Sequence, residues 1–120
     1  MMTDRPQPKR GEVWWVKPGK TAGAELQKKR PYVVISADAM GNVPIKIVVP
    51  FKTWQDRFAD WPWVVRIEPT RVNGLKRTEA ADVMQVKSLD TSKFIELQGR
   101  LSAAEMDDIT AALAIVVEYE

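Results

Sequence analysis

The chain has no cysteine and no histidine among its 120 residues. It therefore cannot form disulfides, a thiolate nucleophile or the Cys/His sites that bind structural zinc. A Ser-His-Asp triad, or a nuclease that uses a pair of histidines, is excluded for the same reason. Any catalysis must depend on Arg, Lys, Glu, Asp, Ser, Thr or Tyr side chains, and a carboxylate-bound magnesium ion remains possible in principle.

Long apolar segments are also missing. No run approaches the roughly 18 residues that cross a bilayer. The polar, proline-bearing segment 1–10 lacks the apolar stretch of a secretory signal. We therefore expect a cytoplasmic protein with a flexible tail at residues 1–10 and a single domain over residues 11–120.

The net charge of +2 is small but unevenly distributed along the chain. Residues 1–30 contain eight Lys/Arg and three Asp/Glu, whereas residues 94–120 contain one Arg and six Asp/Glu. A basic segment on a nearly neutral chain is compatible with a local anionic partner. Charge by itself favours the simpler explanation of solubility.

Short runs of β-branched and aromatic residues, separated by turn residues, predict a mainly β fold. The expected strands cover residues 11–17, 31–37, 43–51, 63–68, 80–86 and 95–98. Pro50 should break the third strand near its end, and Gly99 should end the sixth. Loops are expected at 18–30 and 52–62, and a short helical turn at 88–93.

A helix should follow, because Ser102 and Glu105 have the spacing of a capping box. Its apolar stripe consists of Met106, Ile109, Leu113 and Val116. We expect five or six strands in a strongly bent sheet that is closed or capped by this helix.

The strongest chemical signal lies around Glu25 and Arg30, where a long loop meets a buried strand. Pro31 restricts Arg30 to extended backbone angles. A carboxylate can take the proton of a ribose 2′-OH, and a guanidinium can stabilise the charge that grows on phosphorus. Such a reaction needs no metal, because the nucleophile belongs to the substrate. Without further information, an exposed ion pair on a surface loop is the more common explanation.

Several segments, in order along the chain, resemble those of the MazF/PemK toxin family. They are RGEVWWV at 10–16 with GAE at 23–25 and RPYVVIS at 30–36, VVPFKT at 48–53, NGL at 73–75, QVKSLD at 85–90, and GRLS at 99–102 followed by Glu105-Met106. The resemblance extends over residues 10–117, and the ordered set is more specific than any one segment.

The resemblance implies a compact, SH3-like PemK-type half-open β-barrel with a C-terminal helix, which forms a homodimer. It implies a sequence-specific endoribonuclease toxin that cleaves single-stranded RNA (mRNA) without a cofactor and leaves a 2′,3′-cyclic phosphate and a 5′-hydroxyl. The implied protein partner is a cognate antitoxin, a short MazE-like chain whose disordered tail blocks the RNA groove.

Residue by residue, the resemblance places catalytic roles on Arg30, Glu25 and Thr53. Arg30 would stabilise the transition state, Glu25 would act as acid or base, and Thr53 would hold the scissile phosphate. Among the neighbouring residues, the RNA contacts are expected at Lys28, Lys29, Lys52 and Trp54.

Two departures from the family pattern leave alternatives open. Lys52 occupies the first position after Pro50-Phe51, where the family has a Thr. Met84 stands before Gln85, where many members have an acidic residue, and Asp82 lies two residues earlier. The alternatives are a protein of this fold that only binds RNA, or one that poisons a topoisomerase by contact.

Overall fold

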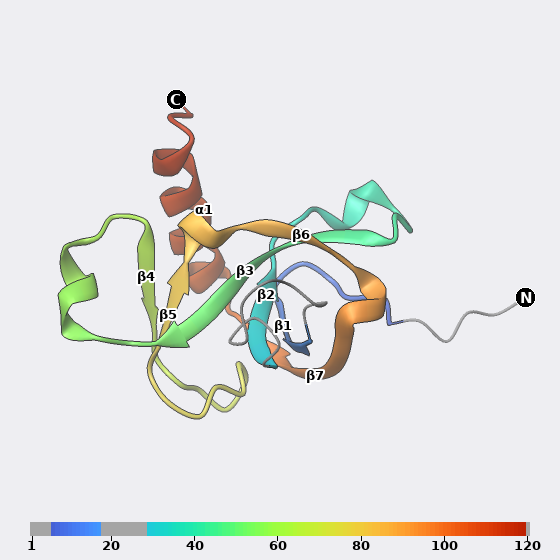
Figure 1. The fold of residues 1–120 in the computed structure, drawn as a ribbon, viewed down its shortest axis with the longest axis horizontal. Coiled ribbons are helices and arrows are strands. Elements are labelled where there is room, and N and C mark those ends of the chain that lie inside the picture. Colours follow the sequence, from blue (N-terminus) through green and yellow to red (C-terminus); the bar gives the residue numbers. More distant parts are fainter. Residues whose placement is uncertain (1–5, 18–28, 120) are drawn as a thin grey trace, which may run out of the picture.

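The computed structural model describes residues 6–17 and 29–119 of the chain. Its strands are β1 (Glu12–Val16), β2 (Arg30–Val34), β3 (Ile45–Thr53), β4 (Val64–Ile67), β5 (Glu79–Asp82), β6 (Lys87–Asp90) and β7 (Phe94–Arg100). One helix, α1 (Ala103–Val116), ends the fold, and short 3-10 turns are η2 (Asp38–Met40), η3 (Asp56–Asp60), η4 (Val83–Gln85) and η5 (Thr91–Lys93). Figure 1 shows the strands wrapping around one another with α1 against one end of the sheet.

All strand pairs are antiparallel, in the order β4-β5-β3-β2-β1-β7, and β6 pairs with the first part of β3. The sheet does not close, so the predicted half-open β-barrel with a C-terminal helix is confirmed. The central strand β3 connects two parts of the barrel. Its first residues pair with β6, its middle residues pair with β2, and its last residues pair with β5.

Strand β3 is longer than predicted, and the expectation that Pro50 breaks it is wrong. The strand continues through Pro50 to Thr53, so Lys52 and Thr53 lie in the sheet rather than in a loop. Proline lacks the N–H that a ladder needs. Along one edge of β3 the partner changes from β6, which pairs up to Val48, to β5, which pairs from Phe51 onward. Pro50 lies in this gap, so its missing donor breaks no bond to either strand.

Other boundaries also differ from the prediction. Strand β2 begins at Arg30, one residue early, and the region predicted as a helical turn contains strand β6 before η5. The expectation that Gly99 ends the sixth strand is wrong, since β7 runs through Gly99 to Arg100. Gly99 instead lets the strand pass close to a neighbouring turn. A Cβ at Gly99 would lie 2.4 Å from the carbonyl carbon of Asn73, so only glycine fits there.

The helix is confirmed together with its capping box. The Ser102 hydroxyl accepts from the Glu105 N–H, and the Glu105 carboxylate accepts from the Ser102 N–H. Met106 and Ile109 are buried in the main core between the sheet and α1. No helix in the described part of the chain is long and apolar enough to cross a membrane.

The described part of the N-terminal segment, residues 6–10, lies against the fold. Pro8 is buried, and the Arg10 guanidinium donates to the Ile35 carbonyl and, at 3.3 Å, to the Thr110 hydroxyl. The Arg10 N–H also donates to the Asp38 carboxylate at 2.8 Å. These contacts connect the start of β1 to η2 and α1.

Candidate active site

Two adjoining recesses open on the face of the barrel where β2, β3 and β5 meet. The first recess, of about 210 Å³, is lined by Arg30, Tyr32, Pro50, Phe51, Lys52, Asp82, Gln85 and Lys87. The second recess, of about 500 Å³, is lined by Trp15, Lys29, Arg30, Pro31, Phe51, Lys52, Thr53, Lys76, Arg77, Glu79 and Gln98. Because three residues line both recesses, we treat the two as one groove.

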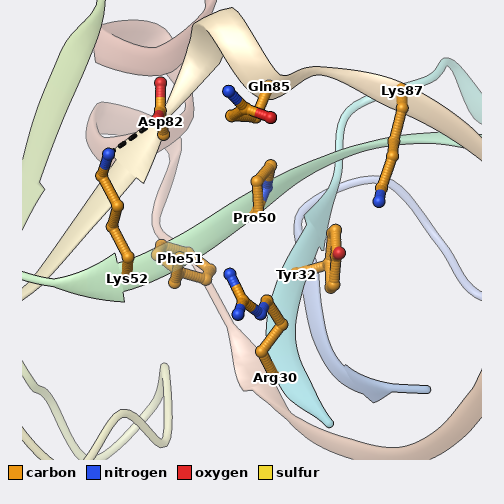
Figure 2. A pocket seen from close by; sticks show the side chains of 8 residues that line it. All are labelled: Arg30, Tyr32, Pro50, Phe51, Lys52, Asp82, Gln85 and Lys87. Atoms are coloured by element: carbon orange, nitrogen blue, oxygen red, sulfur yellow. Dashed lines mark hydrogen bonds and ion pairs between the residues drawn. The ribbon is translucent and has the colours of Figure 1, made fainter. Parts of the chain in front are cut away.

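Arg30 lies where the two recesses meet. It is the first residue of β2 and pairs with Val16 of β1, so its backbone is held in the sheet. Figure 2 shows its guanidinium pointing into the first recess, beside Phe51 and below Pro50. Within the described part of the chain, no carboxylate lies within ion-pair distance of Arg30. The geometry of its fork of donors matches that of a phosphate.

Lys52 and Asp82 form an ion pair at the other side of the first recess. The Lys52 Nζ donates to the Asp82 Oδ2 at 2.8 Å, shown as the dashed line in Figure 2. The Asp82 side chain is only 7% exposed, whereas the Lys52 side chain is 37% exposed. The ion pair therefore has a buried acidic partner and an accessible basic one.

The groove is strongly basic. Among the described residues, its cations are Lys29, Arg30, Lys52, Lys76, Arg77 and Lys87, against the two carboxylates Asp82 and Glu79. The Lys52–Asp82 pair accounts for one carboxylate, and Glu79 Oε2 lies 3.4 Å from Arg77 Nε. Burial raises the pKa of the Glu79 carboxyl, and the nearby Arg77 charge opposes this rise. The excess of positive charge suits a polyanionic ligand.

The structure brings four of the predicted residues to the groove. Arg30 and Lys52 line both recesses, and Lys29 and Thr53 line the second. Thr53 is the last residue of β3 and is exposed. The other two loop residues of the prediction, Glu25 and Lys28, lie outside the described residues.

Trp54 lies apart from both recesses. Its ring packs edge-on against Phe58, with centroids 5.7 Å apart, and the Arg66 guanidinium lies 5.1 Å from its centroid. It belongs with Trp61 and Trp63 to an aromatic cluster around Phe58. Its contact with an RNA base stays a prediction, and the structure gives Trp54 a packing role.

Several lining residues were not among the predicted site residues. They are Tyr32, Lys76, Arg77, Glu79, Gln85 and Lys87, together with Asp82. From the sequence, Asp82 is only an acidic residue two positions away from the one where many family members have theirs, yet it lines the first recess. The basic pair Lys76-Arg77 after the Asn73-Gly74 turn was a visible signal. No local pattern reveals the position of Asp82, because it depends on the pairing of β5 with β3.

The arrangement of cations suits chemistry at a phosphodiester. The Arg30 guanidinium and the Lys52 ammonium can contact non-bridging phosphate oxygens and stabilise added negative charge. Tyr32 and Phe51 provide apolar walls close to these charges. Among the described residues, no three acidic side chains gather closely enough to hold a metal ion.

Comparisons with known proteins agree with this geometry. Residues 9–117 match the family described as "PemK-like, MazF-like toxin of type II toxin-antitoxin system". The chain is 29% identical over 113 residues to endoribonuclease MazF9 of Mycobacterium tuberculosis, covering 89% of this chain and 93% of that relative. It is also 29% identical over 108 residues to the probable endoribonuclease MazF of Mycolicibacterium smegmatis, covering 89% of this chain and 94% of the relative.

Solved structures show the same fold. A mycobacterial endoribonuclease in complex with its cognate antitoxin superposes with a TM-score of 0.75 at 20% identity, covering 95% of this chain and 98% of that one. MazF from Deinococcus radiodurans superposes with a TM-score of 0.71 at 21% identity, covering 92% and 96%. Since the family match extends over nearly the whole chain, this protein belongs to the PemK-like, MazF-like toxins of type II toxin–antitoxin systems.

Proposed function

We propose that this MazF-type endoribonuclease toxin cleaves single-stranded RNA through attack of a ribose 2′-OH on the adjacent phosphorus. The 5′-oxygen leaves, so the products are a 2′,3′-cyclic phosphate and a 5′-hydroxyl. The observation that carries this proposal is the guanidinium of Arg30 at the junction of a basic groove, where no described carboxylate pairs with it. Arg30 can bind the scissile phosphate with two parallel hydrogen bonds and stabilise the phosphorane-like transition state.

The other predicted residues complete the reaction. Thr53 and Lys52 hold the scissile phosphate from β3, while Glu25 takes the 2′-OH proton as general base. Lys28 and Lys29 contact flanking phosphates, and no metal is needed, because charge stabilisation comes from the protein and the nucleophile from the RNA.

We also propose that the protein acts as a homodimer and is inhibited by a cognate antitoxin. For the antitoxin, support comes from solved structures of similar fold, which include a mycobacterial endoribonuclease in complex with its cognate antitoxin and a MazE-MazF structure from Deinococcus radiodurans. A groove rich in cations suits an acidic, extended segment of a partner chain. Such a segment would compete directly with RNA.

The test is cleavage of a long single-stranded RNA by purified, antitoxin-free protein in excess EDTA, with analysis of the new ends. We expect discrete fragments with cyclic phosphate ends, and a fall of about a hundredfold or more in rate for Arg30→Ala. Arg71→Ala removes an exposed arginine that lines neither recess, and it should retain full activity.

Two results would contradict the proposal. Cleavage that EDTA abolishes would contradict the metal-independent mechanism. RNA that stays intact across varied sequences would contradict cleavage itself, and binding assays with RNA and with a topoisomerase would then separate the two non-catalytic alternatives.

A further inference from the structure

The ammonium group of Lys52 is held by two neighbours at the edge of the groove. Asp82 accepts its hydrogen bond at 2.8 Å, and the Phe58 ring lies under it, with 4.7 Å between Nζ and the ring centroid. A free lysine side chain samples many rotamers, whereas this one is fixed by a carboxylate and an aromatic face.

We propose that Asp82 is a positioning residue, which together with Phe58 holds Lys52 as the second cation at the scissile phosphate, opposite Arg30. This inference rests on the proposed RNA cleavage. It gives Asp82 a role in the reaction that the sequence pattern did not, and it explains how a lysine can serve at a position where the family has a threonine.

The strand register makes this contact possible. Lys52 of β3 pairs with Ala80 of β5, and Asp82 lies two residues further along β5 on the same face. The two side chains are therefore diagonal neighbours across the pair of strands. In Figure 2 the Lys52 side chain extends toward Asp82, on the opposite side of Phe51 from Arg30.

Burial indicates that this contact is more than a surface ion pair. Asp82 is 7% exposed, and among the described residues its Oδ1 has no hydrogen-bond partner. A buried carboxylate with so few donors depends on Lys52 for its compensation. The Lys52 side chain in turn is 37% exposed and lines both recesses, and its ammonium has three donors, of which Asp82 takes one.

Phe58 is itself fixed. It is 2% exposed and contacts the rings of Trp54 and Trp61, with centroids 5.7 and 4.9 Å away. The aromatic cluster around Phe58 therefore forms a rigid support beneath the ammonium. Because the charge is already in place before substrate arrives, little reorganisation is needed when negative charge develops on the phosphate.

The experiment measures kcat and KM for cleavage of one defined RNA oligonucleotide. The variants are Asp82→Asn, Lys52→Met, the double variant and Phe58→Leu, each assayed well below its own unfolding temperature. We expect Asp82→Asn to lower kcat about tenfold with KM changed less than threefold, because a misplaced contact slows the chemical step. Lys52→Met should lower kcat at least as much.

The decisive comparison is made in the Lys52→Met background. If Asp82 acts through Lys52, then adding Asp82→Asn there should have no further effect on kcat. Phe58→Leu keeps an apolar side chain but removes the ring. It should therefore lower kcat several-fold when Lys52 is present and have no effect on kcat in the Lys52→Met background. Glu68→Gln is the matched control, because Glu68 pairs with Arg66 at 2.7 Å outside both recesses, and it should leave kcat unchanged.

Three outcomes would overturn the inference. These are an unchanged kcat in Asp82→Asn, an equal fall in both backgrounds, or full activity in Lys52→Met. The proposed function is tested separately: it would be contradicted if the wild-type protein showed no cleavage that depends on Arg30. Active wild-type protein with an insensitive Asp82 would refute the positioning role alone.

Discussion

Replacing either partner of the Lys52–Asp82 pair should have very different effects on stability. Lys52→Met leaves a carboxylate that is 7% exposed without its cation, whereas Asp82→Leu leaves a lysine that is already 37% exposed and can turn to water. Breaking a fully buried pair costs about 3–5 kcal/mol of unfolding free energy. This pair is open to solvent on the lysine side, so we expect about 2–3 kcal/mol for Lys52→Met.

For Asp82→Leu the expected cost is about 0–1 kcal/mol, since an accessible pair contributes little once the lysine can be solvated. The double variant Lys52→Met/Asp82→Leu should lie close to Asp82→Leu, because it buries no uncompensated charge. The coupling energy between the two sites would then equal the cost of Lys52→Met, about 2–3 kcal/mol.

Urea unfolding followed by tryptophan fluorescence measures these differences, provided that the slope of free energy against urea stays constant. Thermal melts should agree, with about 4 °C lost per kcal/mol for a domain of this size. Equal losses for the two single variants, or additive losses in the double variant, would refute the argument that Asp82 depends on Lys52 for its compensation.

Three further predictions follow from the structure. Because burial raises the pKa of the Glu79 carboxyl, the folded protein binds this proton more tightly than the unfolded chain, and stability is lost as the pH rises through the raised pKa. Glu79→Gln should therefore have a higher melting temperature than wild type at neutral pH, and the difference should vanish in acid. Ser102→Ala removes a capping contact to Glu105 and should cost about 1 kcal/mol in urea unfolding. Lys76→Ala and Arg77→Ala should each lower the salt dependence of RNA affinity by about 0.7 in log–log slope, as measured by fluorescence anisotropy, and unchanged slopes would show that these cations do not contact phosphate.

Local patterns were sufficient for most of the elements. The capping box at Ser102 and Glu105 identified the start of α1, because its two hydrogen bonds join residues three apart. The errors occurred where long-range pairing overrides a local signal. A proline usually ends a strand, but β3 changes partners at Pro50, and the strand continues to Thr53.

The site shows the same division. The position of Arg30 at the start of a buried strand was predictable, because Pro31 limits its backbone and the strand follows at once. The sequence did not predict that Arg30 shares a groove with Lys76 and Arg77, because those cations come from a loop more than forty residues later in the chain.

By itself, the sequence determined the family, the mainly β fold with a C-terminal helix, and the exclusion of cysteine and histidine chemistry, and it singled out Arg30, Lys52 and Thr53, which line the groove. Each of these depends on composition or on residues close together in the chain. Only the tertiary structure decided that Lys52 pairs with Asp82, 30 residues away. The reason is physical: a shift of one residue in the register of β5 would turn the Asp82 side chain to the other face of the sheet, and local sequence does not specify that register.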